Sequence, residues 1–168
     1  SSGKIVMLPK NINVLRHRNS LFFYEEKKIQ HKYECIKEIE LNKKTYFDHV
    51  KIEYNRLKTK PKSFLSTKSK CYINRSISKL SIRYINKNDR FIPFSKRKSV
   101  NLWQYLSKKK LNMLQKMSTL VICDKNQIVW VVGICIDDRY KVLSGDDYLS
   151  ELKIQPLTNT NEHMISYY

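Results

Sequence analysis

The fold of this chain is decided by the stretch Ile128-Val129-Trp130-Val131-Val132-Gly133-Ile134-Cys135-Ile136-Asp137-Asp138-Arg139-Tyr140. It opens with a short apolar run of the length typical of a buried strand, far too short to cross a bilayer. An equally apolar phrase, residues 120–123, precedes it, and the turn-forming residues 124–127 separate the two. We therefore expect an antiparallel hairpin with Trp130 in the core.

Outside the hairpin, several phrases alternate apolar and polar residues as half-buried strands do. Val50 to Tyr54 is the clearest, and a second strand phrase starts at Ile77 and runs to Tyr84. Residues 137–142 and 151–154 predict two further short strands, whereas helix and strand patterns compete between residues 25 and 44.

Residues 101–114 carry leucines at helical spacing and predict an amphipathic helix with Asn101 as its N-cap. Combined with the strand phrases, this predicts an α+β fold: small, mainly antiparallel sheet units with one or two helices.

The chain length of 168 residues suits one domain or two small ones. Residues 58–63 are rich in Lys, Pro and Ser and predict an exposed linker. We expect residues 1–54 to form an N-terminal region, residues 55–70 a basic linker, residues 71–156 a compact domain and residues 157–168 a polar tail. The chain begins Ser1-Ser2-Gly3 without an initiator Met or a signal-peptide pattern, which indicates a segment of a longer cytoplasmic protein with no membrane partner.

Positive charge is concentrated in the middle of the chain. The formal net charge is +18, and residues 55–116 contain 18 Lys and Arg against a single acid, Asp89. Such a concentrated field attracts polyanions and gains affinity by releasing counterions from phosphates. The sequence also lacks Ala and is rich in Lys, Asn and Ile, as proteins of AT-rich genomes are. It therefore leaves open a second interpretation, a solvated surface whose lysines reflect codon usage.

Neither the cysteines nor the acids form a recognisable chemical motif. The four cysteines are widely spaced without a C-x-x-C pair, so we interpret them as buried reduced thiols and predict no metal site. No Gly-rich phosphate loop, nucleophile–base pair or paired carboxylates are found, so no catalytic or cofactor-binding residue is predicted.

The chain contains the phrase Arg83-Tyr84-Ile85-Asn86-Lys87-Asn88-Asp89-Arg90-Phe91-Ile92-Pro93-Phe94 and, later, the stretch quoted above from Ile128 to Tyr140. In this order the two phrases resemble the C-terminal domain of bacterial tRNA(Ile)-lysidine synthases. That family carries R-x-W-x-x-G-D-x-F-x-P-F-G and then I-V-W-V-x-G-x-x-I-D-x-R-F. Here the first phrase runs from Arg83 to Phe94 and the second from Ile128 to Tyr140, with a Lys-rich amphipathic stretch between them. The family's Gly before Asp is Asn88, a residue that tolerates positive φ. Both glycines of the loop after Pro-Phe are replaced in residues 95–99.

The resemblance implies the synthase-type C-terminal domain and an RNA partner. In this family the enzyme activates the wobble cytidine of an isoleucine tRNA with ATP and Mg²⁺ and joins lysine to it, while the C-terminal region holds the tRNA. The family's catalytic S-G-G-x-D-S loop is absent from these 168 residues. The second implied partner is therefore a catalytic domain, either in another part of the same protein or in a separately encoded chain.

The same resemblance and the cationic stretch supply the candidate tRNA-binding residues. They are Arg83, Asp89, Arg90, Lys96, Arg97, Lys98, Lys108, Lys109, Lys110 and Arg139. An internal Arg83–Asp89 ion pair is an equal alternative to a tRNA contact, and pairing of Arg139 with Asp137 is the better interpretation for that residue. Phe91 and Phe94 are interpreted as packing residues that fix the loop.

Two alternatives to a tRNA-holding part of a synthase remain open from sequence. One is a stand-alone basic RNA-binding module, for which the charge alone suffices. The other is a degenerate or split synthase half without activity of its own.

Overall fold

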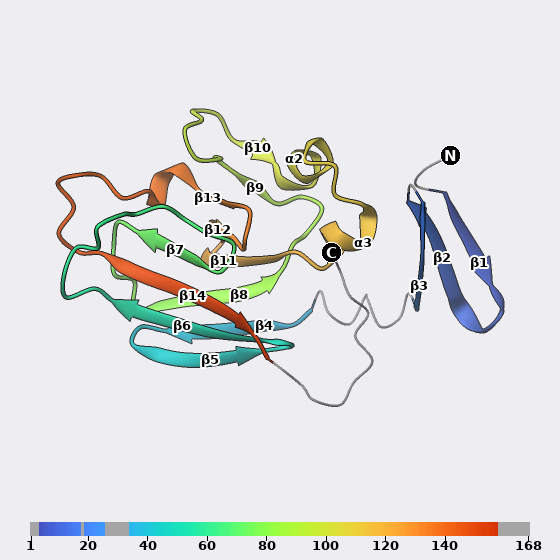
Figure 1. The fold of residues 1–168 in the computed structure, drawn as a ribbon, viewed down its shortest axis with the longest axis horizontal. Helices are drawn as coiled ribbons and strands as arrows, with labels where there is room; N and C mark the ends of the chain where they lie inside the picture. Colours follow the sequence, from blue (N-terminus) through green and yellow to red (C-terminus); the bar gives the residue numbers. More distant parts are fainter. Residues whose placement is uncertain (1–3, 18, 26–33, 158–168) are drawn as a thin grey trace.

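The computed structural model describes residues 4–17, 19–25 and 34–157 (Figure 1). Apart from Leu157, the predicted polar tail lies outside these residues. The architecture is mainly antiparallel β-structure with two short α-helices, which confirms the predicted α+β class. Among the described residues, no helix is long and apolar enough to cross a membrane.

A four-stranded antiparallel sheet joins strands from residues 43–56 to strands from residues 70–73 and 150–156. Its strand order is β5-β6-β14-β7. The strands are β5 (Lys43–Phe47), β6 (Val50–Arg56), β14 (Ser150–Pro156) and β7 (Lys70–Ile73). The strands predicted at residues 50–54 and 151–154 are both confirmed, and they pair with each other along their whole length.

The predicted hairpin is the centre of a five-stranded sheet. The order is β13-β12-β11-β8-β4. The strands are β13 (Cys135–Ile136), β12 (Gln127–Val131), β11 (Leu120–Asp124), β8 (Lys79–Tyr84) and β4 (Ile36–Glu40). The hairpin pairs Val121 with Val131, and its register shifts between Ile122 and Cys123.

The central hairpin is apolar throughout because both of its faces are covered. On one face Ile122 and Trp130 share a core with Ile52 and Leu152 of the four-stranded sheet. The other face packs against the helical segment that begins at Leu102. Trp130 is fully buried, which confirms its predicted place in the core.

The helical segment follows a short β-ladder formed by β9 (Arg90–Phe91) and β10 (Val100–Asn101). It consists of α2 (Leu102–Lys108) and α3 (Met113–Met117), where sequence predicted a single helix over residues 101–114. The Asn101 side chain accepts a hydrogen bond from the Gln104 backbone N–H, so the predicted N-cap is confirmed. Asn112 forms a capping box with Gln115 and thereby begins the second helix. Leu102 and Leu106 of α2 pack against the hairpin's second face.

Two predictions from sequence differ from the structure. Residues 138–140 form a 3₁₀ turn, η2 (Asp138–Tyr140), within the stretch predicted as a strand at residues 137–142. The predicted boundary between residues 1–54 and 71–156 crosses both sheets, since β4 pairs with β8 and β6 pairs with β14. Residues 36–56 are therefore built into the same fold as residues 71–156.

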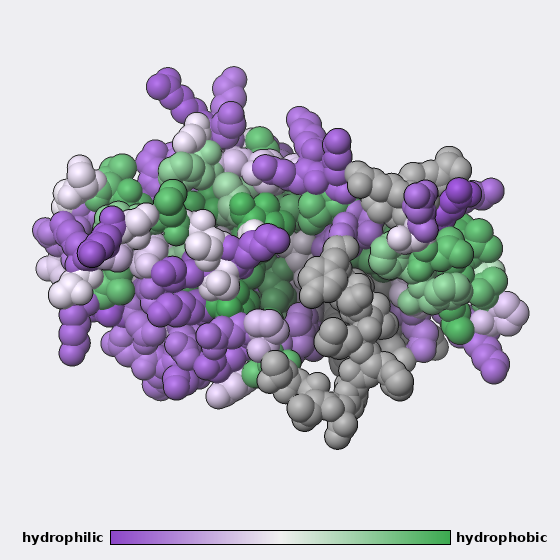
Figure 2. Space-filling view, in the orientation of Figure 1, coloured by the Kyte–Doolittle hydropathy of each residue, from purple (hydrophilic) through white to green (hydrophobic). Residues whose placement is uncertain are grey.

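The N-terminal residues form a separate three-stranded meander. It contains β1 (Ile5–Leu8), a short 3₁₀ turn η1 (Pro9–Asn11), β2 (Ile12–His17) and β3 (Ser20–Glu25). Exposed apolar side chains gather over these strands, as Figure 2 shows. Of the segment from residue 25 to 44, where helix and strand competed, residues 36–40 and 43–44 are in strands, and residues 26–33 lie outside the description.

The thiol prediction is confirmed for two of the four cysteines. Cys71 and Cys123 are buried, and burial raises the pKa of each thiol. Cys135 is half-buried and Cys35 is exposed, so for these two the prediction of buried thiols was wrong. Within the described residues, no group of three or more His, Cys, Asp or Glu is arranged to hold a metal ion.

Candidate nucleic-acid interface

The two sequence phrases that are far apart in the chain lie side by side in the structure. Residues 92–94 run antiparallel to residues 136–138, with Pro93 opposite Asp137. The Asp138 backbone N–H donates to the Ile92 carbonyl at 2.8 Å, and the Phe94 N–H donates to the Ile136 carbonyl at 3.1 Å. The second phrase therefore supports the first.

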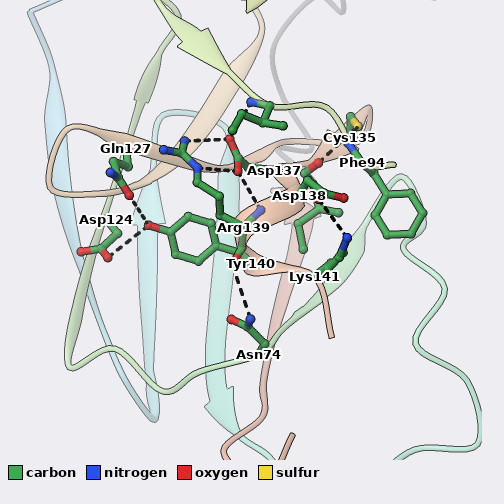
Figure 3. A network of polar contacts seen from close by, with 12 residues as sticks. Asn74, Phe94, Asp124, Gln127, Cys135, Asp137, Asp138, Arg139, Tyr140 and Lys141 are labelled. Carbon is green, nitrogen blue, oxygen red and sulfur yellow. Dashed lines mark hydrogen bonds and ion pairs between the residues drawn. The ribbon is translucent and has the colours of Figure 1, made fainter. Parts of the chain in front are cut away.

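Asp137 is the centre of this junction. Its carboxylate is fully buried and accepts hydrogen bonds from the Ile92 N–H at 2.8 Å and the Arg139 N–H at 3.0 Å. The Arg139 guanidinium approaches the same carboxylate through two nitrogens, each at 2.9 Å (Figure 3). The bidentate geometry satisfies the buried charge. The predicted Asp137–Arg139 pairing is thus confirmed, and the hydrogen bond to Asp137 raises the pKa of Arg139.

Asp138 holds the next part of the first phrase. Its carboxylate accepts a hydrogen bond from the Ser95 backbone N–H at 2.9 Å and pairs with the Lys141 ammonium at 2.9 Å. The hydrogen bond from Lys141 lowers the pKa of Asp138, so this carboxylate is charged at neutral pH. Two consecutive acids, separated by more than forty residues from their targets, fix the backbone from Ile92 to Ser95.

Residues 93–96 form a β-turn. The Lys96 N–H donates to the Pro93 carbonyl at 2.8 Å, and Ser95, the third residue of the turn, has a φ of 63°. A positive φ at this position is typical of a type II turn, which favours Gly. The positive φ that favours Gly therefore occurs at Ser95. Asn88, for which the sequence suggested such a conformation, is not among the described residues with positive φ.

The turn displays an aromatic ring and leads into three cations. Phe94 is 53% exposed, so its interpretation as a packing residue was wrong, whereas Phe91 is fully buried as predicted. Lys96, Arg97 and Lys98 follow and are all exposed. Within the part of the chain that the structure describes, none of the three makes an ion pair.

Arg83 and Asp89 form an internal ion pair. The guanidinium meets the carboxylate through two hydrogen bonds of 2.8 and 2.9 Å, and both side chains are largely buried. Burial is the largest single influence and disfavours the charged guanidinium, but the hydrogen bond to Asp89 and the charges of Cys123 and Asp89 together exceed it, so the pKa of Arg83 is raised. Asp89 also accepts a hydrogen bond from the Asn86 N–H, so the pair shapes the loop of residues 86–89.

The other candidate cations lie at the same edge of the molecule. Arg90 on β9 is exposed and donates to the Ser99 carbonyl at 3.0 Å. This bond lies at the base of residues 93–98, which comprise the β-turn and the three cations and are called the cationic turn below. β9 pairs with β10, which leads directly into α2 and its C-terminal lysines, Lys108, Lys109 and Lys110. All three are exposed. Hydrophilic side chains project from this edge, at the top of Figure 2.

The ten predicted residues therefore fall into two groups. Arg83, Asp89 and Arg139 have internal partners and shape the loops. The remaining seven present charge to solvent. Sequence analysis missed the roles of Asp138, Ser95 and Phe94, and the only signal available was that Asp138 and Phe94 lie within the two recognised phrases. Whether any of these residues contacts RNA stays a prediction.

Comparisons with known proteins agree with the resemblance seen in sequence. A tRNA(Ile)-lysidine synthase of Parabacteroides distasonis is 35% identical over 63 residues, which is 38% of this chain and 14% of that protein. A crystal structure of a TILS C-terminal domain superimposes with a TM-score of 0.60 at 14% identity, covering 74% of this chain and 100% of that one. No family model matches the sequence. The chain thus resembles the C-terminal region of these synthases and has the fold of that domain, while it spans only a small part of the full-length relative.

Proposed function

We propose that this chain is the tRNA-holding C-terminal part of an ATP-dependent ligase that joins lysine to the wobble cytidine of an isoleucine tRNA. The observation that carries the proposal is the cationic turn of residues 93–98. Asp137 and Asp138 fix the backbone from Ile92 to Ser95, and the three cations that follow have no acidic partner among the described residues. A backbone that is already fixed places these cations at a defined position on the surface, where they are able to neutralise and position a phosphate backbone.

The proposed division of labour separates charge from shape. Arg90, the three cations of the turn and the three lysines at the C-terminal end of α2 would neutralise phosphates, which makes binding steeply dependent on salt. Arg83, Asp89 and Arg139 would act on RNA through loop geometry, because their charges are already compensated within the protein. ATP and Mg²⁺ would serve a catalytic domain elsewhere, since these residues offer no phosphate-cradling loop.

A salt titration of binding to isoleucine tRNA tests the proposal. We expect log Kd to depend linearly on log salt concentration, with a slope of about 0.9 for each phosphate neutralised on a duplex. Lys109→Gln combined with Lys110→Gln should lower that slope by roughly one to two units and weaken binding to an unrelated duplex RNA about equally. Arg83→Gln should weaken binding with little change in slope.

The matched control replaces two exposed lysines that lie outside the candidate interface, Lys37→Gln on β4 and Lys44→Gln on β5. These should leave the slope unchanged. If both double variants lower the slope equally, binding follows net charge alone, and if the chain binds no RNA, the positive surface is a solvated one. Reading the coding sequence upstream of Ser1 is an independent test, because an in-frame S-G-G-x-D-S loop would supply the catalytic half.

A further inference from the structure

An open cavity of about 530 Å³ lies beside the cationic turn. Its walls come from the connection between β6 and β7, which supplies Phe64 and Leu65, from Tyr72 on β7, and from Phe94. Phe64 and Tyr72 meet edge to face with ring centroids 5.7 Å apart. The cavity is therefore an aromatic and aliphatic groove formed by segments distant in sequence.

Phe94 is held at the rim of this groove by its backbone. Its N–H is hydrogen-bonded to the Ile136 carbonyl, and the next residue is bonded to Asp138. The ring points away from the Asp137–Arg139 network (Figure 3) and is 53% exposed. A large apolar ring fixed in a half-exposed position gives up burial that it would gain in a core. The backbone thus keeps a half-exposed aromatic ring beside the groove, where it offers a surface for stacking.

The electrostatic surroundings of the groove select an anion-bearing ligand. Lys141 lines the groove and no acidic residue does. Asp138 accepts a hydrogen bond from the Ser95 N–H and pairs with Lys141, so these two charges compensate each other and the net positive charge beside the groove comes from residues 96–98. Lys96, Arg97 and Lys98 leave the turn directly after Phe94 and Ser95. Aromatic rings beside a cationic track are the combination that binds single-stranded nucleic acid, because bases stack while phosphates are neutralised.

We propose that this groove accepts an unpaired RNA base, stacked on Phe94, while the cations of residues 96–98 hold the adjoining phosphates. The proposal rests on the RNA-holding function argued above and adds to it a requirement for a single-stranded segment. A base inside a duplex keeps its faces covered by its neighbours, so only an unpaired nucleotide can enter.

The test compares two RNA probes, a blunt twelve-base-pair duplex and the same duplex with a four-nucleotide 3′ extension that contains 2-aminopurine. We expect the extension to tighten binding about tenfold and its fluorescence to be quenched on binding, as stacking on an aromatic ring implies. Phe94→Leu should abolish both effects without changing the salt slope, since no charge is altered. Phe94→Tyr should preserve them, because a phenol ring stacks as well.

Phe23→Leu is the matched control, since Phe23 is also a half-exposed Phe, 58% exposed, but lies in the separate β1–β3 sheet. It should leave the gain from the extension intact. Equal, salt-dependent binding of both probes would overturn the groove proposal and leave RNA binding standing. Equal weakening of both probes by Phe94→Leu would also overturn it. Failure of both probes to bind at low salt would overturn the proposed function itself.

Discussion

At residue 95 the backbone adopts a conformation that a serine reaches only at a cost. Its φ of 63° lies in the left-handed region, where the side chain of an L-residue crowds the following carbonyl. The strain persists because the Ser95 N–H is fixed by Asp138 and the turn is closed by the Lys96 hydrogen bond. The conformation serves to place Phe94 at the corner of the turn.

Replacing Ser95 by Gly should therefore stabilise the protein. Relief of the left-handed conformation contributes about 1–2 kcal/mol, and the greater freedom of Gly in the unfolded chain removes about 0.4–1 kcal/mol. We expect a net increase of about 0.5–1 kcal/mol in the free energy of unfolding, measured by urea denaturation.

Ser99→Gly is the control, since Ser99 lies in the same loop without a positive φ. It should lower stability by about 0.4–1 kcal/mol through the unfolded state alone. Equal effects of the two substitutions would show that the turn carries no strain at residue 95.

Residue-level features were predictable where the partners lie close together in sequence. The Asp137–Arg139 pair was favoured from its spacing, the Arg83–Asp89 pair was one of two equal interpretations, and the burial of Trp130 was predicted from its apolar neighbours. The bond from Ser95 to Asp138 joins residues 43 positions apart, and nothing in either local pattern indicates the other. Phe94 was misread for the same reason, since exposure depends on which distant segments cover a side chain.

At the scale of elements, the connection between β6 and β7 determines whether the residues before and after it belong to one domain or to two. Its composition resembles that of an interdomain linker, but its ends are anchored to one sheet. The Leu57 N–H donates to the Leu149 carbonyl at 2.9 Å, and the Ser69 carbonyl accepts from the Ile154 N–H at 2.8 Å. The alternation of a strand predicts that it is a strand without naming its partner, which is why the pairing of β6 with β14 could not be inferred.

Limited trypsin digestion should distinguish a loop from a linker. Among the residues 34–157, we expect the first cuts after Lys58 and Lys62, which are exposed and outside helices and strands, while Lys60 is protected by the following Pro61. The two fragments should then elute together under native conditions, because β6 and β14 remain paired. Urea should be needed to separate them.

Lys51 and Lys153 serve as internal controls, since both lie within the paired strands β6 and β14. Early cleavage at either would contradict the observed sheet. Separation of the nicked fragments without denaturant would restore the boundary predicted from sequence.

At the scale of the whole molecule, a strongly cationic surface covers a core that contains titratable groups. Tyr140 is fully buried, and its hydroxyl lies 3.2 Å from both the Asp124 carboxylate and the Gln127 amide oxygen, joining η2 to the hairpin turn. Burial, followed by the charge of Asp124, raises the pKa of Tyr140 to about 12. Burial likewise raises the pKa of Tyr105 to about 12 and that of Cys123 to about 11.

These raised values predict loss of stability in alkaline solution. A group whose folded pKa exceeds its unfolded pKa contributes stability that is complete below the unfolded value and is lost as the pH rises to the folded value. The free energy of unfolding should therefore be level near pH 8 and fall between about pH 9 and pH 12, by an amount of the order of several kcal/mol.

Tyr140→Phe isolates one contribution. The variant loses the hydroxyl's hydrogen bonds and should be less stable at pH 8, yet its stability should fall less steeply between pH 10 and pH 12, because no buried phenol remains there to resist ionisation. Urea denaturation at a series of pH values gives the slopes, and tyrosinate absorbance gives the ionisation directly. If the variant keeps the wild-type slope, the Tyr140 hydroxyl ionises in the folded protein as it does in the unfolded chain, and its burial between η2 and the hairpin turn contributes nothing to the alkaline limit.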